Sequence, residues 1–513
     1  METDAAFVDE LLAPVAPLTI DETTPLNGEV AGKPQKTLKQ LATHGSIWTI
    51  GGYGCTQVLR FGANLVMAKL LFPEAFGLMA IVNGVMQGLV MFSDVGIGQS
   101  IIRHDRNDDP EFYNTAWTVQ VIRGFMLMIG AMMLAWPVGY FYEPFLIPLI
   151  SAIAVTALIS GFTPTKLMTA NRDLKLARLT IIDLTAQIVA IVIMVAFARY
   201  HHSVWSFVVG SFASVSVRLM LGYLAIPGPT NQFCWSPKAA HELLRFGRWI
   251  FVSTMFTFLA MQSDKLILGR MVPLLTLGIY SVAFSMMATV SGVFEQLAGR
   301  VLMPAMCHVS KSSVSRLADV VLRSRQFILM GAAVAVADLI LLAPAVFRVL
   351  YDARYQDAAW MTQLLGCGLW FTLLQRTSEA SLLATGHSRA MAVANAMNFL
   401  VTIIAAPFGF YWFGIAGFIG GWTLGNFAAV VVMDRELVRH GIGVARQDVH
   451  MSVYVTVLCA AGFMLQHFSH PHAGGKLLLL VADLSAAMAV SFVGAIAIFV
   501  RNRHFAFVKA GAV

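Results

Sequence analysis

Charged side chains are rare inside the long apolar runs of this sequence. Four of them could act on a substrate: Arg60, Arg123, Asp264 and Lys265. A charge at the centre of a bilayer costs about 2.5–3.5 kcal/mol on insertion scales, so such a side chain normally faces protein or water instead of lipid. These four residues are therefore our candidates for binding a substrate.

The two arginines have side chains suited to an oxyanion. The planar guanidinium of Arg60 can bind two phosphate oxygens at once, and it lies well past the middle of its apolar run. The alternative is a structural arginine bonded to backbone carbonyls at a helix break. Arg123 lies a turn or two inside its own run, where it could meet the same anion or extend to the membrane interface. The second explanation is favoured for Arg218 and Arg376.

Asp264 and Lys265 are adjacent, so on a helix their side chains point about 100° apart and face different neighbours. Asp264 could pair with Arg60, or it could bind a coupling proton or sodium ion. The alternative is a static ion pair that holds two helical bundles together. Asp183 is left without a role.

Three further charged residues lie near the predicted cytoplasmic ends of their apolar runs. We interpret Asp94, Glu295 and Arg300 as candidate gating residues, with Arg123 or Arg300 as the partner of an acid when the gate shuts. The alternative is helix-end charges that water satisfies. No metal site or cofactor is expected, because the only clustered histidines (His467, His470 and His472) lie in a polar turn and no phosphate-binding glycine loop is present.

The composition indicates that lipid is the main solvent of this chain. Of its 513 residues, 58% are hydrophobic and 12% are charged, whereas a soluble domain has about 25% charged residues. A membrane helix needs about 20 apolar residues, and runs of this length predict an all-α membrane protein of about fourteen transmembrane helices. The predicted spans are 45–69, 75–100, 115–141, 144–168, 178–198, 203–226, 249–271, 276–303, 325–348, 357–383, 388–409, 412–433, 450–468 and 477–500.

Most of the 35 lysines and arginines fall on alternate loops between these spans. Because cytoplasmic loops are enriched in Lys and Arg, both termini are predicted to be cytoplasmic, and the net charge of +7 needs no nucleic-acid partner. The predicted outer loops are short, which argues against an enzyme acting at the outer face. The predicted organisation is a disordered acidic tail (1–43), a six-helix bundle (44–226), a linker (227–248), a second six-helix bundle (249–433) and two additional helices with a short tail (434–513).

An internal repeat relates the two predicted bundles. The segment Asn64–Lys69 aligns without gaps with Lys265–Arg270, and in the same register Gly77 aligns with Gly278. An even number of spans separates the copies, so the halves have parallel topology. Parallel repeats related by an axis along the membrane normal are a transporter architecture, with the substrate path between the halves.

Several motifs carry a resemblance to a known family. The runs Ala68-Lys-Leu-Leu-Phe-Pro-Glu-Ala-Phe-Gly-Leu78, Phe92-Ser-Asp-Val-Gly-Ile-Gly98 and Asp264-Lys-Leu-Ile-Leu-Gly-Arg270, with Val301-Leu-Met-Pro304, resemble the polysaccharide-transporter family of the MATE-like (MOP) flippase superfamily. The resemblance spans roughly residues 40–440 and does not include the acidic tail.

The resemblance implies a fold, a substrate and partners. The fold is MATE-like, with the first, second, seventh and eighth helices lining a central cavity. The substrate is an oligosaccharide repeat unit on an undecaprenyl-pyrophosphate carrier, flipped across the bacterial inner membrane by alternating access for exopolysaccharide, capsule or O-antigen synthesis, with a polymerase and chain-length proteins as possible partners. Two alternatives stay open: a MATE-type cation-coupled drug antiporter, and a membrane polymerase or ligase.

Overall fold

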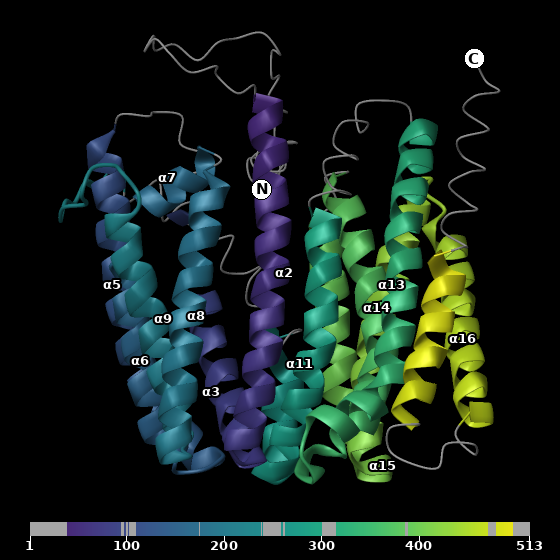
Figure 1. Cartoon of the computed structure of the whole chain (residues 1–513). Helices are drawn as coiled ribbons and strands as arrows, with labels where there is room; N and C mark the ends of the chain where they lie inside the picture. Colours follow the sequence, from purple (N-terminus) through teal and green to yellow (C-terminus); the bar gives the residue numbers. More distant parts are fainter. Residues whose placement is uncertain are drawn as a thin grey trace.

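The computed structural model shows a bundle of long helices that run roughly along one direction (Figure 1). It describes residues 38–93, 97–98, 101, 109–173, 175–237, 239, 258–259, 262–299, 314–384, 388–469 and 479–495. Within these ranges, eight helices are long and apolar enough to cross a membrane, and nine if a helix pair bent by 65° counts as one span. The chain is therefore a multi-pass membrane protein.

The first group of helices contains α2 to α9. Its members are α2 (Leu38–Leu70), α3 (Pro73–Phe92), α5 (Pro110–Phe141), α6 (Leu146–Gly161), α7 (Lys166–Arg172), α8 (Leu176–His201) and α9 (Trp205–Leu224). Helices α3 and α5 each begin with a proline, whose fixed φ and missing N–H suit the first helical position. The bent pair is α6 with α7. Helix α5 packs on α6, and α8 packs on both α9 and α2.

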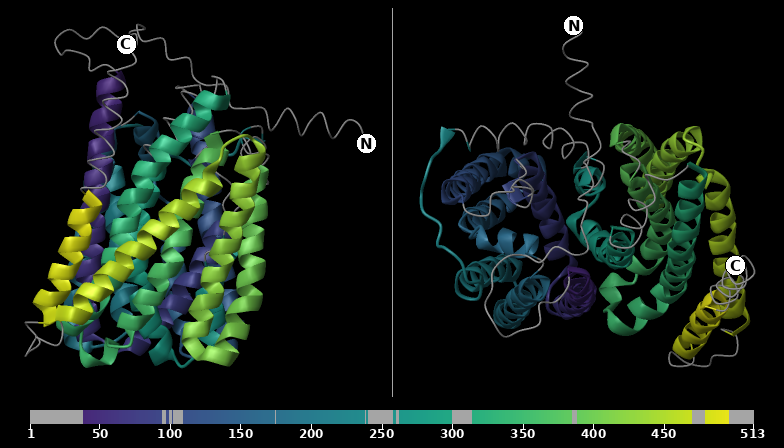
Figure 2. Two further views of the ribbon diagram at one scale, coloured as in Figure 1. Left: turned by 90° about the vertical axis from the view of Figure 1, so that its right-hand side faces the viewer. Right: turned by 90° about the horizontal axis from the view of Figure 1, so that it is seen from above.

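The second group contains the helices from α11 onward. Its members are α11 (Leu274–Leu297), α13 (Val314–Leu350), the short 3-10 turn η2 (Ala353–Tyr355), α14 (Ala358–Ala384), α15 (Ser388–Arg439) and α16 (Val444–Ser469), with helical segments 262–271 and 479–495. Helix α14 packs on α11, α13 and α15. Seen from above, α2 to α9 lie on one side and α13 to α16 on the other, with α11 where the groups meet (Figure 2).

Helix α15 is two antiparallel arms joined at Gly414. This residue has φ 59° and ψ −142°, a backbone conformation that a residue with a side chain rarely adopts. The break lies at the boundary between the predicted spans 388–409 and 412–433. The arms approach so closely that a Cβ on Gly417 would overlap the carbonyl oxygen of Gly409. Small residues at such crossings let membrane helices pack backbone to backbone.

A matched pair of substitutions tests this crossing. Gly417→Ala should lower stability, because added atoms in a packed interior typically cost about 1–3 kcal/mol. Gly420→Ala is the control, since a Cβ at Gly420 meets no atom within 4 Å. The measurement is the thermal unfolding midpoint of each purified variant in the same detergent. Equal midpoints would show that the arms are not tightly packed.

The two groups of helices meet through a symmetric contact at the starts of α3 and α11. A Cβ on Gly77 would overlap the carbonyl oxygen of Leu274, and a Cβ on Gly278 would overlap that of Pro73. In the register of the internal repeat, Gly77 corresponds to Gly278 and Pro73 to Leu274. Each copy therefore presents the same patch to the other, as expected for elements related by a two-fold axis.

Candidate functional site

A large cavity lies within the first group of helices. It has a volume of about 1100 Å³ and is lined by residues of α2, α3 and α5 to α9. A neighbouring cavity of about 670 Å³ shares three lining residues with it, namely Arg60, Asp183 and Arg218. The two spaces therefore meet around these side chains, and together they exceed the usual 300–1,000 Å³ of a small-molecule pocket. We call this combined space the cationic cavity.

The charges that line the cationic cavity are mostly positive. Among the described lining residues the ionised groups are Arg60, Arg123, Arg218 and Asp183. Arg218 Nε lies 2.8 Å from Asp183 Oδ1, so this exposed arginine has a counter-ion that the sequence did not predict. For Arg60 the structure shows no hydrogen bond or ion pair within the described ranges, so its guanidinium is available to an anion. Arg60 and Arg123 both line the larger of the two spaces.

Arg123 binds the end of α3. Its Nε donates to Ser93 Oγ at 3.0 Å, and its Nη2 donates to the carbonyl oxygen of Val90 at 2.9 Å. A cation at the last turn of a helix satisfies unpaired carbonyls and complements the negative end of the helix dipole. The side chain therefore holds α3 against α5 at the rim of the cationic cavity and does not simply extend to the membrane interface.

Asp264 and Lys265 lie apart from this cavity. Asp264 is 2% exposed, and the hydroxyl of Tyr280 donates to its Oδ2 at 2.9 Å. Lys265 Nζ lies 4.2 Å from the ring centroid of Phe284, one turn further along α11. The expected pairing of Asp264 with Arg60 is wrong in this structure, because the carboxylate is buried against α11. Both side chains tie segment 262–271 to that helix.

Of the three predicted gating residues, only Glu295 can be placed, because Asp94 and Arg300 lie outside the described residues. Glu295 Oε1 lies 2.9 Å from Arg376 Nε, and Arg376 Nη1 is 2.9 Å from Glu379 Oε2. Among the described residues the partner of Glu295 is thus Arg376 of α14, whereas Arg123 bonds to the end of α3. The suggested pairing with Arg300 falls outside the described residues. The Glu295–Arg376 pairing also corrects the interpretation of Arg376 as an interfacial side chain.

A second, smaller cavity lies among α11, α14 and α15. Its volume is about 190 Å³. Four amide side chains line it together with two aromatic rings and the Glu295–Arg376 pair; the amides are those of Gln375, Asn395, Asn398 and Asn426. We call it the amide pocket. The sequence interpretation missed these residues, although four amides in three apolar runs are themselves a signal, because polar groups at membrane depth need partners.

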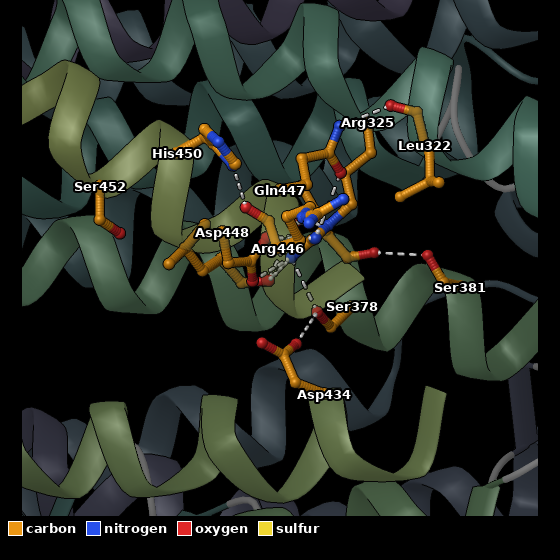
Figure 3. Close-up of polar contacts among 12 residues, drawn as sticks. Leu322, Arg325, Ser378, Ser381, Asp434, Arg446, Gln447, Asp448, His450 and Ser452 are labelled. Carbon is orange, nitrogen blue, oxygen red and sulfur yellow. Dashed lines mark hydrogen bonds and ion pairs between the residues drawn. The ribbon is translucent and has the colours of Figure 1, made fainter. Parts of the chain in front are cut away.

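A buried ion pair lies elsewhere in the second group. Arg325 is fully buried and makes a bidentate pair with Asp448, joining α13 to α16 (Figure 3). Its guanidinium also donates to Thr377 Oγ1 and Ser378 Oγ of α14, both at 2.9 Å. Sequence analysis placed Arg325 at the cytoplasmic start of a span and gave it no partner. Its donors are used within the protein, so we assign it a structural role.

Breaking the Arg325–Asp448 pair should strongly destabilise the protein. Asp448→Asn removes the carboxylate and leaves a buried cation, which typically costs about 3–5 kcal/mol. The control is Arg439→Gln, because the Arg439–Glu436 pair is exposed and such pairs contribute about 0–1 kcal/mol. Thermal unfolding in detergent provides the measurement, and a control that unfolds as early as Asp448→Asn would contradict the assignment.

A protein-family model identifies the family of this chain. The family model described as "Polysaccharide biosynthesis protein" matches residues 66–360, which is more than half of the chain. The chain belongs to this family. The matched region includes α3, α11 and the described lining of the cationic cavity except its α2 residues, among them Arg60.

Three relatives are named as succinoglycan, lipopolysaccharide or amylovoran biosynthesis proteins. The succinoglycan biosynthesis transport protein ExoT of Rhizobium meliloti is 23% identical over 46% of this chain and 48% of its own length. The lipopolysaccharide biosynthesis protein WzxC of Escherichia coli is 22% identical, over 53% of this chain and 56% of its own. The amylovoran biosynthesis protein AmsL of Erwinia amylovora is 24% identical over 52% and 69%. The alignments thus span about half the length of the first two relatives.

Solved structures share the fold. The lipid II flippase MurJ, in an inward closed conformation, superposes with a TM-score of 0.68 over 90% of this chain and 99% of its own, at 11% identity. An inward-facing multidrug resistance MATE family transporter of the MOP superfamily gives 0.59 over 75% and 94%, at 15% identity. The MATE-like fold implied by the sequence motifs is therefore confirmed.

Proposed function

We propose that this family member is a flippase that moves undecaprenyl-pyrophosphate-linked oligosaccharide repeat units across the bacterial inner membrane. The observation that carries the proposal is Arg60, an arginine without a counter-ion among the described residues, in a large cavity whose described lining is mostly positive, inside a helical membrane protein. A pyrophosphate is an anion that such a cavity stabilises, while the polyprenyl tail stays in lipid. Relatives named for exopolysaccharide and lipopolysaccharide biosynthesis support the substrate class.

The proposed architecture has fourteen transmembrane helices in two six-helix bundles plus two C-terminal helices, with both termini cytoplasmic. The symmetric contact between α3 and α11 supports two related halves. The cationic cavity lies along the second half of α3, from Asn83 to Val90, whereas the glycine contact closes the first turns of this helix. In the proposed orientation the closed end is the outer one, so the structure corresponds to an inward-facing state.

In the proposed cycle the protein alternates between a state that is closed at its outer end and a state that is closed at its cytoplasmic end. The head group enters the cationic cavity from the cytoplasmic leaflet, because arginines there replace part of the water that the pyrophosphate would lose in hydrocarbon. The contact at Gly77 and Gly278 opens as the opposite end closes, and the head group leaves outward. Coupling to a proton or sodium gradient, and delivery to a polymerase and chain-length proteins, complete the proposal. The chain itself forms no covalent bond.

Removing the charge of Arg60 should abolish export. Arg60→Gln deletes the guanidinium that the structure leaves without a partner, so polymer export should fall at least tenfold, equivalent to about 1.4 kcal/mol or more of lost binding. Arg60→Lys should retain part of the activity, because a charge remains without the planar fork. Arg199→Gln in the last turn of α8 is the control. The measurement is surface polymer per cell at matched membrane expression.

Two outcomes would contradict this assignment. Full export by Arg60→Gln would remove Arg60 from the mechanism. Drug resistance on overexpression, with no export defect on gene deletion, would favour the MATE-type antiporter instead; the arginines of the cationic cavity disfavour that alternative, because they repel cations.

The glycine contact should control access from the outer side. Gly77→Ala or Gly278→Ala places a methyl group against a backbone carbonyl, so the outer end should close incompletely. A cysteine introduced at Gln87 in the cationic cavity, in a background without native cysteines, should then react faster with a membrane-impermeant thiol reagent added from outside. Gly62→Ala is the control, since a Cβ there meets nothing within 4 Å. Unchanged labelling in both glycine variants would place the outer gate elsewhere.

A further inference from the structure

We propose that the amide pocket is a subsite for a neutral sugar ring of the lipid-linked substrate, separate from the cavity that takes the pyrophosphate. The inference rests on the proposed function, because it assumes that a lipid-linked sugar enters the space between the two halves. In this proposal the first group of helices binds the pyrophosphate, and the second group binds a sugar ring of the same head group.

The amides of the pocket come from three helical segments and are partly bonded to each other. Gln375 Nε2, on α14, donates to Asn395 Oδ1 at 3.0 Å and to Glu379 Oε1 at 3.2 Å. Asn398 Nδ2, on the first arm of α15, donates to Asn426 Oδ1 of the second arm at 3.1 Å. These bonds fix the orientation of each amide and therefore decide which groups remain for a ligand.

One acceptor and one donor group of this set remain unused. Gln375 uses its nitrogen, and no hydrogen bond is present to its Oε1 within the described ranges. Asn395 accepts through Oδ1, and its Nδ2 likewise makes no described bond. Gln375 is 6% exposed and Asn395 is partly exposed, and both line the cavity, so these two groups are accessible to a polar occupant such as water or a sugar hydroxyl. A sugar hydroxyl can bond to both groups, because it donates to Gln375 Oε1 and accepts from Asn395 Nδ2.

The remaining walls suit the apolar face of a sugar. The rings of Phe284 and Trp422 line the same cavity, with centroids 6.2 Å apart and planes at 66°. Aromatic walls with a few placed polar groups are the usual composition of a small-molecule site. A pyranose has the matching chemistry, since C–H bonds cover its faces and hydroxyls surround its rim.

Size and charge separate this subsite from the cationic cavity. A volume of about 190 Å³ is below the range of drug-sized pockets, so it suits one ring and not a whole head group. Its only described ionised lining residues are Glu295 and Arg376, which pair with each other. The lining thus lacks the excess of arginines that favours a pyrophosphate in the cationic cavity.

The test compares two lipids on the full-length protein in nanodiscs. One is the undecaprenyl-pyrophosphate-linked repeat unit extracted from the producing cells, and the other is undecaprenyl pyrophosphate without sugars. Asn395→Leu should weaken binding of the first about three- to tenfold, the loss expected for one or two neutral hydrogen bonds, and leave the second unchanged. Asn395→Gln should restore part of the affinity. Arg60→Gln should weaken binding of both lipids.

Each other outcome is decisive. If Asn395→Leu binds both lipids like the wild type, or loses both equally together with thermal stability, the amides only join α14 to α15 and the subsite is wrong, while the Arg60 result still supports the flippase. If the wild-type protein binds neither lipid, the proposed function fails and the subsite with it.

Discussion

The close approach of Gly77 and Gly278 is the constraint on which the arrangement of the molecule depends. It brings the backbones of α3 and α11 together and thereby sets the distance between the two groups of helices. Further contacts extend along the same boundary, such as the 3.0 Å bond from Asn64 to Ser285. The cationic cavity lies to one side of this boundary, within the first group of helices.

Charged groups at membrane depth divide into two kinds. Arg325 is buried and bonded to Asp448, so the protein itself compensates the cost of removing this charge from water. Asp264 is also buried, and Tyr280 donates to its Oδ2, but its Oδ1 accepts no hydrogen bond within the described residues. Arg60 is exposed to a cavity and has no such partner among the described residues. Because an unpaired charge is costly in lipid, its position identifies where water and an anion can enter. This contrast separates structural from functional charges better than sequence position does.

Sequence reasoning predicted the helical membrane fold, the repeat and the location of Arg60 and Arg123, because hydrophobicity and isolated charge are local properties of the chain. It could not predict side-chain partners. Arg376 pairs with Glu295 across two helices, and Asp264 bonds to Tyr280 instead of Arg60. Such pairings depend on helix rotation and on the angle at which helices cross. Among the described residues, α2 and α3 line the larger space and α11 the smaller, while residues 249–257 of the predicted seventh helix lie outside the described ranges.

The pairing of Arg218 with Asp183 has a consequence for turnover. A transporter must release its substrate on the far side of the membrane. A cavity in which every guanidinium bound the same phosphate would hold the substrate too tightly for release. In the proposed transport cycle, a pyrophosphate competes with Asp183 for Arg218 and with the end of α3 for Arg123. These internal competitors then shorten the time for which the substrate stays bound.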